Sequence, residues 1–194
     1  AKPYPEFADL FQGIITGDNE KFLRFWYELN INKISFNQKS MNDINLKESF
    51  WIPYNKGGAF RKWYGNQDYV VNWKNGPNDK TRGKESFSDY YLREYVSWSY
   101  ITSSTLASRY FPYGFLWDVS GSGFFDKTNN IKYLNALLGS VVGIEILKLI
   151  NPTVNYQVEN VSVIPVLLPK DDSEKKYIED MVDQCINISA EGWD

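Results

Sequence analysis

The sequence predicts an α+β domain in which mixed or antiparallel strands come first and helices come last. Short aromatic-rich segments, separated by turn residues, fill most of the chain between residues 22 and 119. Two longer segments, 131–150 and 173–188, instead repeat apolar residues at three- and four-residue spacing, which is typical of helices. The length of 194 residues suits a single domain, so residues 1–194 are expected to form one unit.

The expected strands carry aromatic and branched side chains between turn signals. Their ranges are 22–29, 49–54, 60–64, 69–73, 96–101 and 107–119. Gly65-Asn66-Gln67-Asp68 separates two of them, which predicts a hairpin of 60–64 with 69–73. Pro112 and Gly114 are expected to interrupt the last strand. A short helix over 86–95, with Ser86 or Ser88 as its cap, completes this part.

The helix expected at 131–150 has a wide apolar stripe, which predicts a long and largely buried helix. It is expected to end at Asn151-Pro152, because proline cannot continue a helix. The helix expected at 173–188 begins near several acidic residues, which the helix dipole favours. Its apolar stripe includes Cys185, and we expect that thiol to be buried and structural.

The composition excludes several kinds of catalysis. The chain has no histidine, which removes Ser-His-Asp and Cys-His catalysis and nearly every zinc site. Its single cysteine cannot form an internal disulfide and fits a reducing compartment. Residues 1–20 lack the pattern of a signal peptide, and Asn135, Glu145 and Lys148 interrupt the longest apolar stretch. A cytoplasmic protein without a membrane span is therefore expected.

Charge is distributed unevenly along the chain. The formal net charge is −3 in total, but it is −1 over residues 1–53, +4 over 54–109 and −6 over 110–194. The middle third is therefore the expected surface for an anionic ligand.

One motif in this third, residues 54–66, combines glycine, cations and planar rings. Gly57 and Gly58 lie between Lys56 and the pair Arg61-Lys62, so backbone amides and cations can approach a phosphate together. Trp63 and Tyr64 add planar faces, while Asn55 and Asn66 can donate to and accept from a base edge. The alternative is a glycine-rich turn whose cations are only solvated. The motif lacks the Gly-Lys-Ser/Thr ending of a P-loop, so it gives no support for ATP hydrolysis.

A second polar segment, Ser103-Ser104-Thr105 followed by Arg109, could bind phosphate oxygens or a guanine edge. The alternative is a polar loop that leads into a strand. The aromatic residues, 17% of the chain, suit either a core or a stacking surface. A carbohydrate-binding module or a protein-interaction domain with exposed aromatics therefore stays open as a rival to nucleic-acid binding.

Several segments resemble a known family. They are Gly13 to Asn19 with Phe22-Leu23-Arg24, Trp51 to Gly58, Phe60 to Asn66, Val70 to Trp73, Arg109-Tyr110, Gly114 to Ser122, Leu134 to Ser140, Leu149 to Thr153, Asn155 to Val158, Ile164-Pro165, Ile188-Ser189 and Glu191 to Asp194. Together they are similar to the target-recognition region of adenine-specific DNA methyltransferases, above all the PglX type of BREX phage-defence systems. The resemblance covers almost the whole chain.

The resemblance implies a specificity domain like the carboxyl-terminal domain of Taq-type adenine methyltransferases. In that family a separate domain binds S-adenosylmethionine and carries an Asn-Pro-Pro-aromatic motif, which Asn151-Pro152-Thr153 does not match. The expectation is therefore an excised recognition domain that lacks methyl transfer, holds no cofactor or metal itself, and contacts duplex DNA and the methyltransferase domain of its parent chain. The expected DNA-binding residues are Asn55, Lys56, Gly57, Gly58, Arg61, Lys62, Trp63, Tyr64, Asn66, Lys74, Arg82, Lys84, Ser103, Ser104 and Arg109.

Overall fold

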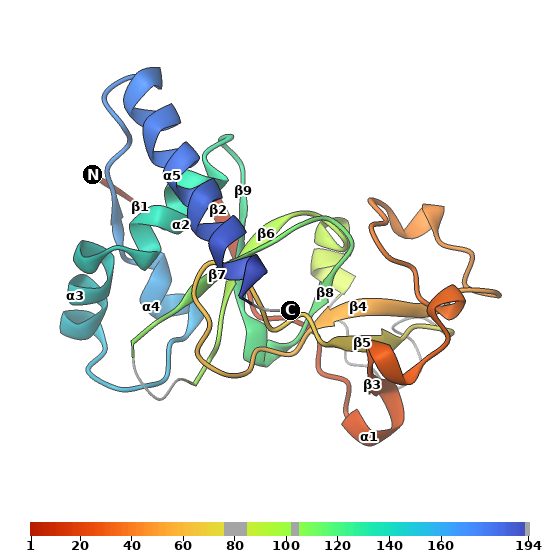
Figure 1. Cartoon of the computed structure of the whole chain (residues 1–194). Coiled ribbons are helices and arrows are strands. Elements are labelled where there is room, and N and C mark those ends of the chain that lie inside the picture. Colours follow the sequence, from red (N-terminus) through yellow and green to blue (C-terminus); the bar gives the residue numbers. More distant parts are fainter. Residues whose placement is uncertain (76–84, 102–104, 193–194) are drawn as a thin grey trace.

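The computed structural model describes residues 1–75, 85–101 and 105–192, which form two four-stranded sheets and a layer of helices (Figure 1). The first sheet has the order β2 (Ala8–Phe11), β9 (Gly123–Asp126), β6 (Tyr95–Trp98) and β7 (Ser108–Phe111). All of its neighbours are antiparallel, and β7 is an edge strand. The helices cover one face of this sheet, as Figure 1 shows.

The second sheet has the order β3 (Leu23–Phe25), β5 (Tyr69–Asn72), β4 (Trp51–Asn55) and β8 (Leu116–Trp117). Its strands pair antiparallel except β4 with β8, which are parallel. Helix α1 (Asn19–Phe22) precedes β3, and β1 (Lys2–Pro3) pairs with β10 (Pro165–Val166) elsewhere. The 3-10 helices of the described ranges are Tyr4–Glu6, Trp26–Glu28, Ile31–Lys33, Met41–Asp43, Glu85–Tyr90 and Val119–Gly121.

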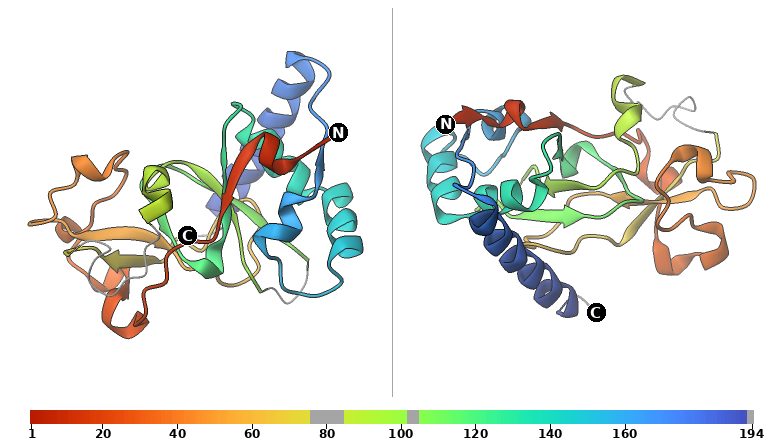
Figure 2. Two further views of the ribbon diagram at one scale, coloured as in Figure 1. Left: turned by 180° about the vertical axis from the view of Figure 1, so that it is seen from behind. Right: turned by 90° about the horizontal axis from the view of Figure 1, so that it is seen from above.

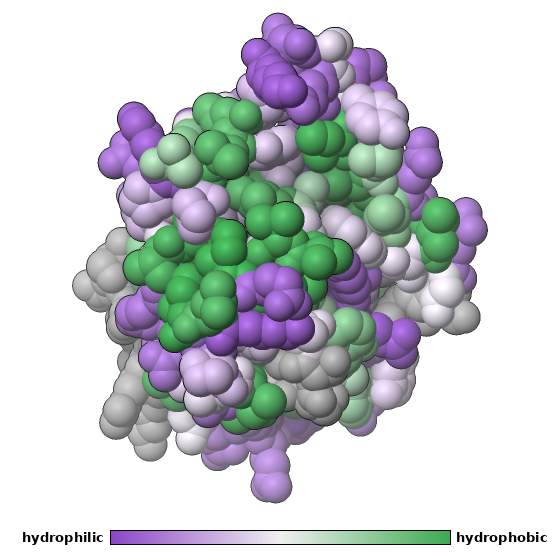
Figure 3. Space-filling model, turned by 90° about the vertical axis from the view of Figure 1, so that its left-hand side faces the viewer, coloured by the Kyte–Doolittle hydropathy of each residue, from purple (hydrophilic) through white to green (hydrophobic). Residues whose placement is uncertain are grey.

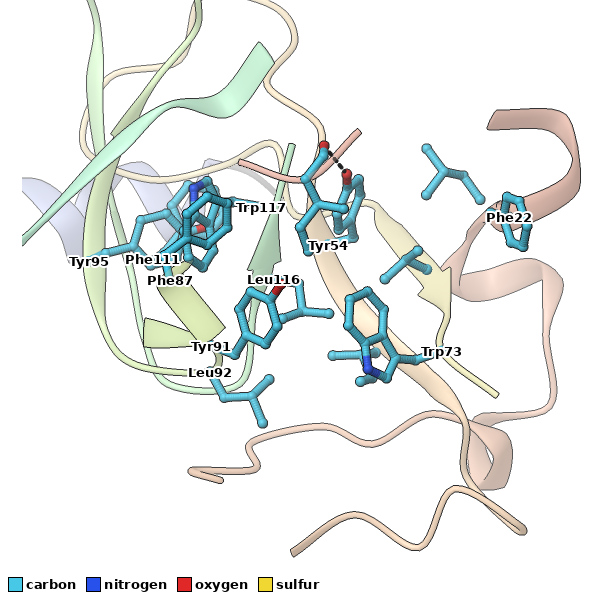
Figure 4. Packing of buried hydrophobic residues seen from close by; sticks show 14 of the residues in the cluster. Phe22, Tyr54, Trp73, Phe87, Tyr91, Leu92, Tyr95, Phe111, Leu116 and Trp117 are labelled. Atoms are coloured by element: carbon cyan, nitrogen blue, oxygen red, sulfur yellow. Dashed lines mark hydrogen bonds between the residues drawn. The ribbon is translucent and has the colours of Figure 1, made fainter. Parts of the chain in front are cut away.

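Strand β6 shows how the first sheet separates two cores. Val96 and Trp98 point into a core shared with the helices, where Leu134 and Leu138 are fully buried. Tyr95, on the opposite face, packs in an aromatic core together with residues of the second sheet. Figure 4 shows this aromatic core, in which Tyr95, Phe111 and Trp117 gather close together and Tyr54 faces them. Because side chains alternate between the two faces of a strand, β6 contributes to both cores and so connects the helical layer with the second sheet.

The helical layer contains α2 (Ile131–Gly139), α3 (Val141–Ile150), α4 (Val158–Ser162) and α5 (Asp172–Glu191). The expected single helix over 131–150 is wrong, because α2 and α3 meet at an angle of 64°. Ser140 has an extended backbone and its Oγ accepts from the amide of Gly143 at 3.0 Å, so it caps a new helix. A Cβ on Gly143 would lie 2.3 Å from the carbonyl oxygen of Leu137, so glycine is required at this close approach.

The expected burial of this segment is also corrected. Helix α3 leaves Val141, Val142 and Leu149 exposed, with Leu149 87% exposed. Helix α5 confirms the second predicted helix, and Asp171 caps it by accepting from the amide of Glu174. Cys185 on α5 is half-buried rather than buried. In the right-hand view of Figure 2 the carboxyl end of α5 points away from the body of the molecule.

Other predictions meet mixed outcomes. The α+β class, strand β4, the interruption at Pro112 to Gly114 and the helix end before Asn151 are confirmed. The hairpin is wrong, because residues 60–64 form no strand and β5 pairs with β3 and β4 instead. Within residues 22–29 the only strand is the short β3, which the 3-10 helix Trp26–Glu28 follows. The helix expected over 86–95 is instead the 3-10 helix Glu85–Tyr90, and β6 begins at Tyr95. Within the described ranges, no single helix has the length and apolarity to cross a membrane. Helices α2 and α3 reach that length and apolarity only when they are counted together, across their bend.

Candidate nucleic-acid interface

The segment that joins β4 to β5, residues 56–68, is called here the 56–68 loop. It contains five residues with positive φ: Gly57, Gly58, Trp63, Gly65 and Asn66. Three of these are glycines, which adopt such a conformation without steric cost. Trp63, with φ of 73°, is a bulky residue for which this backbone is strained. A loop with this conformation persists only where its surroundings fix it, and such strain is concentrated at functional sites.

The start of the loop is fixed by Asn55, which is fully buried at the end of β4. Its Oδ1 accepts from the amide of Gly57 at 2.9 Å, and its Nδ2 donates to Ser97 Oγ at 2.7 Å. A Cβ on Gly57 would lie 2.4 Å from the carbonyl oxygen of Ser120, so only glycine fits there. Asn55 therefore shapes the loop from beneath, and its amide is not displayed to solvent.

The middle of the loop rests on Arg109, which is fully buried on β7. Its Nη1 donates to the main-chain carbonyl of Arg61 at 3.0 Å, and its Nη2 donates to Ser99 Oγ at 3.0 Å. Ser99 Oγ in turn donates to the carbonyl of Gly58 at 3.0 Å. Among the described residues no carboxylate forms an ion pair with Arg109, and its Nε has no hydrogen-bond partner. Burial lowers the pKa of this guanidinium to about 10.

The far side of the loop pairs with the open edge of the first sheet. The amide of Trp63 donates to the carbonyl of Ser108 at 2.9 Å, and the amide of Tyr110 donates to the carbonyl of Trp63 at 3.0 Å. Lys62 Nζ lies 5.0 Å from the centre of the Trp63 ring. A Cβ on Gly139 would lie 3.3 Å from Lys62 Cε, so this side chain passes close to the end of α2. The loop thus covers an edge strand and is held along its length.

Lys56 is engaged by an acid of the chain itself. Its Nζ lies 2.7 Å from Oδ2 of Asp118, a carboxylate that is only 1% exposed. Tyr54 donates to the same oxygen at 2.9 Å, and the amide of Ser120 donates to Oδ1 at 2.8 Å. The ion pair neutralises Lys56, so a phosphate would have to compete with a buried carboxylate for it.

The structure sorts the expected DNA-binding residues by accessibility. Gly58, Arg61 and Lys74 are exposed; Lys56, Lys62, Trp63 and Tyr64 are half-buried; Asn55, Gly57, Asn66 and Arg109 are buried. Arg82, Lys84, Ser103 and Ser104 lie outside the described residues. The accessible members of the loop can meet a phosphate or a base in this conformation. The buried members act as supports for them.

Base reading by Asn55, Asn66 or Arg109 stays a prediction that would require the loop to open. Asn66 donates to the carbonyl of Ala59 at 2.9 Å, which closes the loop on itself. Lys74 lies apart, beyond β5, with its Nζ 5.4 Å from the Phe50 ring. Sequence reasoning missed Ser99 and Asp118, whose roles depend on partners far away in the chain. No run of residues signals such partners.

Two curated proteins match this chain over nearly all of its length. One is the adenine-specific methyltransferase PglX of Lacticaseibacillus casei (strain Zhang), 36% identical over 193 residues, which cover 94% of this chain and 16% of that protein. The other is the adenine-specific methyltransferase BrxX of Escherichia coli O9:H4 (strain HS), 31% identical over 183 residues, or 92% of this chain and 14% of that protein. This chain is a relative of one segment of the PglX and BrxX adenine-specific methyltransferases. It spans less than a fifth of the length of either one. No protein-family profile matches the chain.

Proposed function

We propose that this chain is the target-recognition domain of a PglX-type adenine methyltransferase and that it selects the duplex DNA sequence to be methylated in phage defence. The observation that carries the proposal is the 56–68 loop, which presents Arg61, Lys62 and Trp63 on a backbone fixed from beneath by Arg109. Rigid presentation lowers the entropic cost of binding, and cations at the surface suit the phosphates of DNA.

In this proposal the chemistry lies elsewhere in a longer protein. S-adenosylmethionine and the methyl-transfer residues would belong to the part of PglX-type proteins that this chain does not cover. The chain would supply binding and orientation while the adenine is flipped into that catalytic domain. Such an enzyme would work in the cytoplasm, where DNA is accessible and the half-buried Cys185 stays reduced.

A second surface fits contact with that catalytic part. Apolar side chains gather on the side of the molecule where α3 and α4 lie (Figure 3). The exposed apolar residues of this region are Val141, Val142, Leu149, Ile150, Val154, Val163, Leu167 and Leu168. A large exposed apolar surface is typical of a protein interface. PglX is about six times as long as its matched segment, so further domains are at hand to cover this surface.

The loop can be tested by measuring the binding of fluorescent duplex DNA to the chain between about 50 and 200 mM salt. We expect affinity to fall steeply with salt, and expect the double variant Arg61→Ala/Lys62→Ala to weaken binding to all duplex sequences. The salt slope should fall by about 2 in that variant, since each lost phosphate contact removes about 1. The matched control, Lys170→Ala/Lys176→Ala, changes two exposed lysines far along the chain and should have little effect.

The same titration separates the rival functions. Unchanged affinity in the Arg61→Ala/Lys62→Ala variant would contradict the assignment of the loop. A carbohydrate-binding module would bind sugars with little dependence on salt, and a protein-interaction domain would not bind DNA at any salt concentration.

A further inference from the structure

We propose that a groove beside the 56–68 loop binds a single unpaired nucleobase of the DNA. The groove has a volume of about 380 Å³. It is lined by ten residues, among them Trp26, Phe36, Pro53, Gln67, Tyr69 and Val70. The inference rests on the proposed function, because it assumes that the chain meets DNA, and it adds a ligand site that DNA contact alone does not require.

Aromatic rings form much of the groove wall and stay accessible. Trp26 is 43% exposed and Phe36 is 37% exposed, although both are large apolar side chains. Tyr69 is held in place by stacking on Phe25, with ring centres 4.6 Å apart. A base stacks favourably on an aromatic ring whatever its identity, and such stacking needs rings that are both accessible and fixed in position.

Gln67, one of the residues that line the groove, has a hydrogen-bond donor without a partner in the described part of the chain. This donor is Nε2, and it is buried. A buried donor without a partner costs free energy, and the edge of a base bound beside Gln67 would supply the missing acceptor. The amide group of glutamine, which both donates and accepts, matches the acceptor and donor pattern of a base edge.

The lining residues favour a neutral ring over a phosphate. None of the ten carries a charge. Phosphate contacts would therefore fall to the cations of the neighbouring loop, and the groove would receive the base. Tyr64 belongs to both the 56–68 loop and the groove wall, so the two surfaces are continuous.

The walls come from rigid parts of the fold. Pro53 on β4 and Val70 on β5 are partners in the ladder of the second sheet. The amide of Trp26 donates to the carbonyl of Asp68 at 2.9 Å, which ties the two sides of the groove together. A site that exists before binding can hold an unstacked base at little further cost. Such a base arises when a methyltransferase flips an adenine out of the duplex and leaves its partner unpaired.

The test titrates the whole chain at low salt into two duplexes. One duplex is fully matched, and the other is identical except for a single bulged base, which is the fluorescent analogue 2-aminopurine. We expect tighter binding of the bulged duplex than of the matched one, by fivefold or more, and quenching of 2-aminopurine fluorescence as the base stacks. Trp26→Ala and Gln67→Leu should each remove most of this preference while binding of the matched duplex is kept. The control variant Tyr177→Ala removes a ring on α5 that is 66% exposed and does not line the groove.

The outcomes distinguish the two proposals. Equal binding of both duplexes without quenching, or a preference that survives both groove variants in folded protein, would overturn the nucleobase site and leave the DNA function standing. Failure to bind either duplex would overturn both. Circular dichroism spectra of the variants would establish that each one is folded.

Discussion

Arg109 Nη1 donates a hydrogen bond of 3.0 Å to the main-chain carbonyl of Arg61, so a buried guanidinium supports the backbone of an exposed one. The buried cation has no carboxylate partner among the described residues, and its desolvation is compensated only by neutral oxygens. Burial of this cation therefore costs electrostatic free energy, while its hydrogen bonds fix the 56–68 loop. A cost of this kind is expected where the position of a loop matters for function.

Replacing Arg109 should loosen this loop. Arg109→Met removes the guanidinium that donates to the carbonyl of Arg61 and to Ser99 Oγ. We expect the free energy of unfolding to fall by about 1–3 kcal/mol. The variant also removes the desolvation cost of a buried, unpaired charge, and this gain offsets part of the free energy lost with the hydrogen bonds. Chemical denaturation measures the change, and amide hydrogen exchange at Trp63 should become faster. Arg93→Met, at an exposed arginine, should stay within about 0.5 kcal/mol of the original. Unchanged exchange at Trp63 would show that Arg109 does not hold the loop.

A methyl group on Gly57 should damage the same loop from its other end. Gly57 has φ of 72°, and a Cβ there would lie 2.4 Å from the carbonyl oxygen of Ser120. We expect Gly57→Ala to lower the free energy of unfolding by more than about 1 kcal/mol. Gly192→Ala is the matched control, because a Cβ at that glycine would meet no atom closer than 3.7 Å. Equal stability of the two variants in urea denaturation would contradict the loop geometry.

Alkaline pH should unfold the chain through its buried tyrosines. Burial raises the pKa of Tyr91 to about 12, and it also raises the pKa values of Tyr4 and Tyr95 above their usual range. The folded state then keeps protons that the unfolded chain loses near pH 10, so stability is complete below pH 10 and is lost as pH rises toward 12 and beyond. Circular dichroism during a titration with base follows this loss.

Tyr91 allows the cause to be isolated, because its hydroxyl is buried without a hydrogen-bond partner in the described part of the chain. Tyr91→Phe should therefore be neutral or stabilising by up to about 1 kcal/mol at pH 7, and should move alkaline unfolding to higher pH. Tyr27→Phe, at a residue that is 61% exposed, should change neither property. A clear loss of stability at pH 7 in Tyr91→Phe would indicate a hydrogen bond that the structure does not contain.

The apolar surface of α3 should govern association without governing stability. Leu149 is 87% exposed, so Leu149→Glu should leave the free energy of unfolding within about 0.5 kcal/mol of the original. The variant should associate less with itself at high concentration, which light scattering measures, because an uncovered apolar surface promotes association. Leu147→Glu is the contrasting variant, since Leu147 is 1% exposed and a buried charge there should unfold the chain. Equal light scattering by the original chain and Leu149→Glu would argue against an interface.

Local signals in the sequence were sufficient for some elements and insufficient for others. The acidic start and apolar spacing of α5 predict a helix, and the β-branched and aromatic run of β4 predicts a strand. The break between α2 and α3 depends on one capping residue, Ser140. Because the apolar stripe continues across it, the sequence pattern predicts a single helix there. The predicted hairpin is wrong because β5 pairs with β3 and β4. That pairing depends on long-range packing, which local residue spacing cannot indicate.

The same limit applies to the candidate site. The glycine pair and its flanking cations were visible in the sequence, and the structure places them on one loop with positive φ at both glycines. Residue type did not reveal that Asn55 and Arg109 are buried, because burial depends on β6 and β7 lying beneath the loop. The pairing of Lys56 with Asp118 joins residues 62 positions apart, so no local pattern could signal it.

The most direct measurement of target recognition is the DNA motif methylated by a chimera, in which this chain replaces the matched segment of PglX from Lacticaseibacillus casei. Sequencing that detects modified adenine would read the motif of the chimera and of the original enzyme in the same host. We expect the chimera to methylate adenine in a different sequence. An active chimera that keeps the original motif would contradict that expectation.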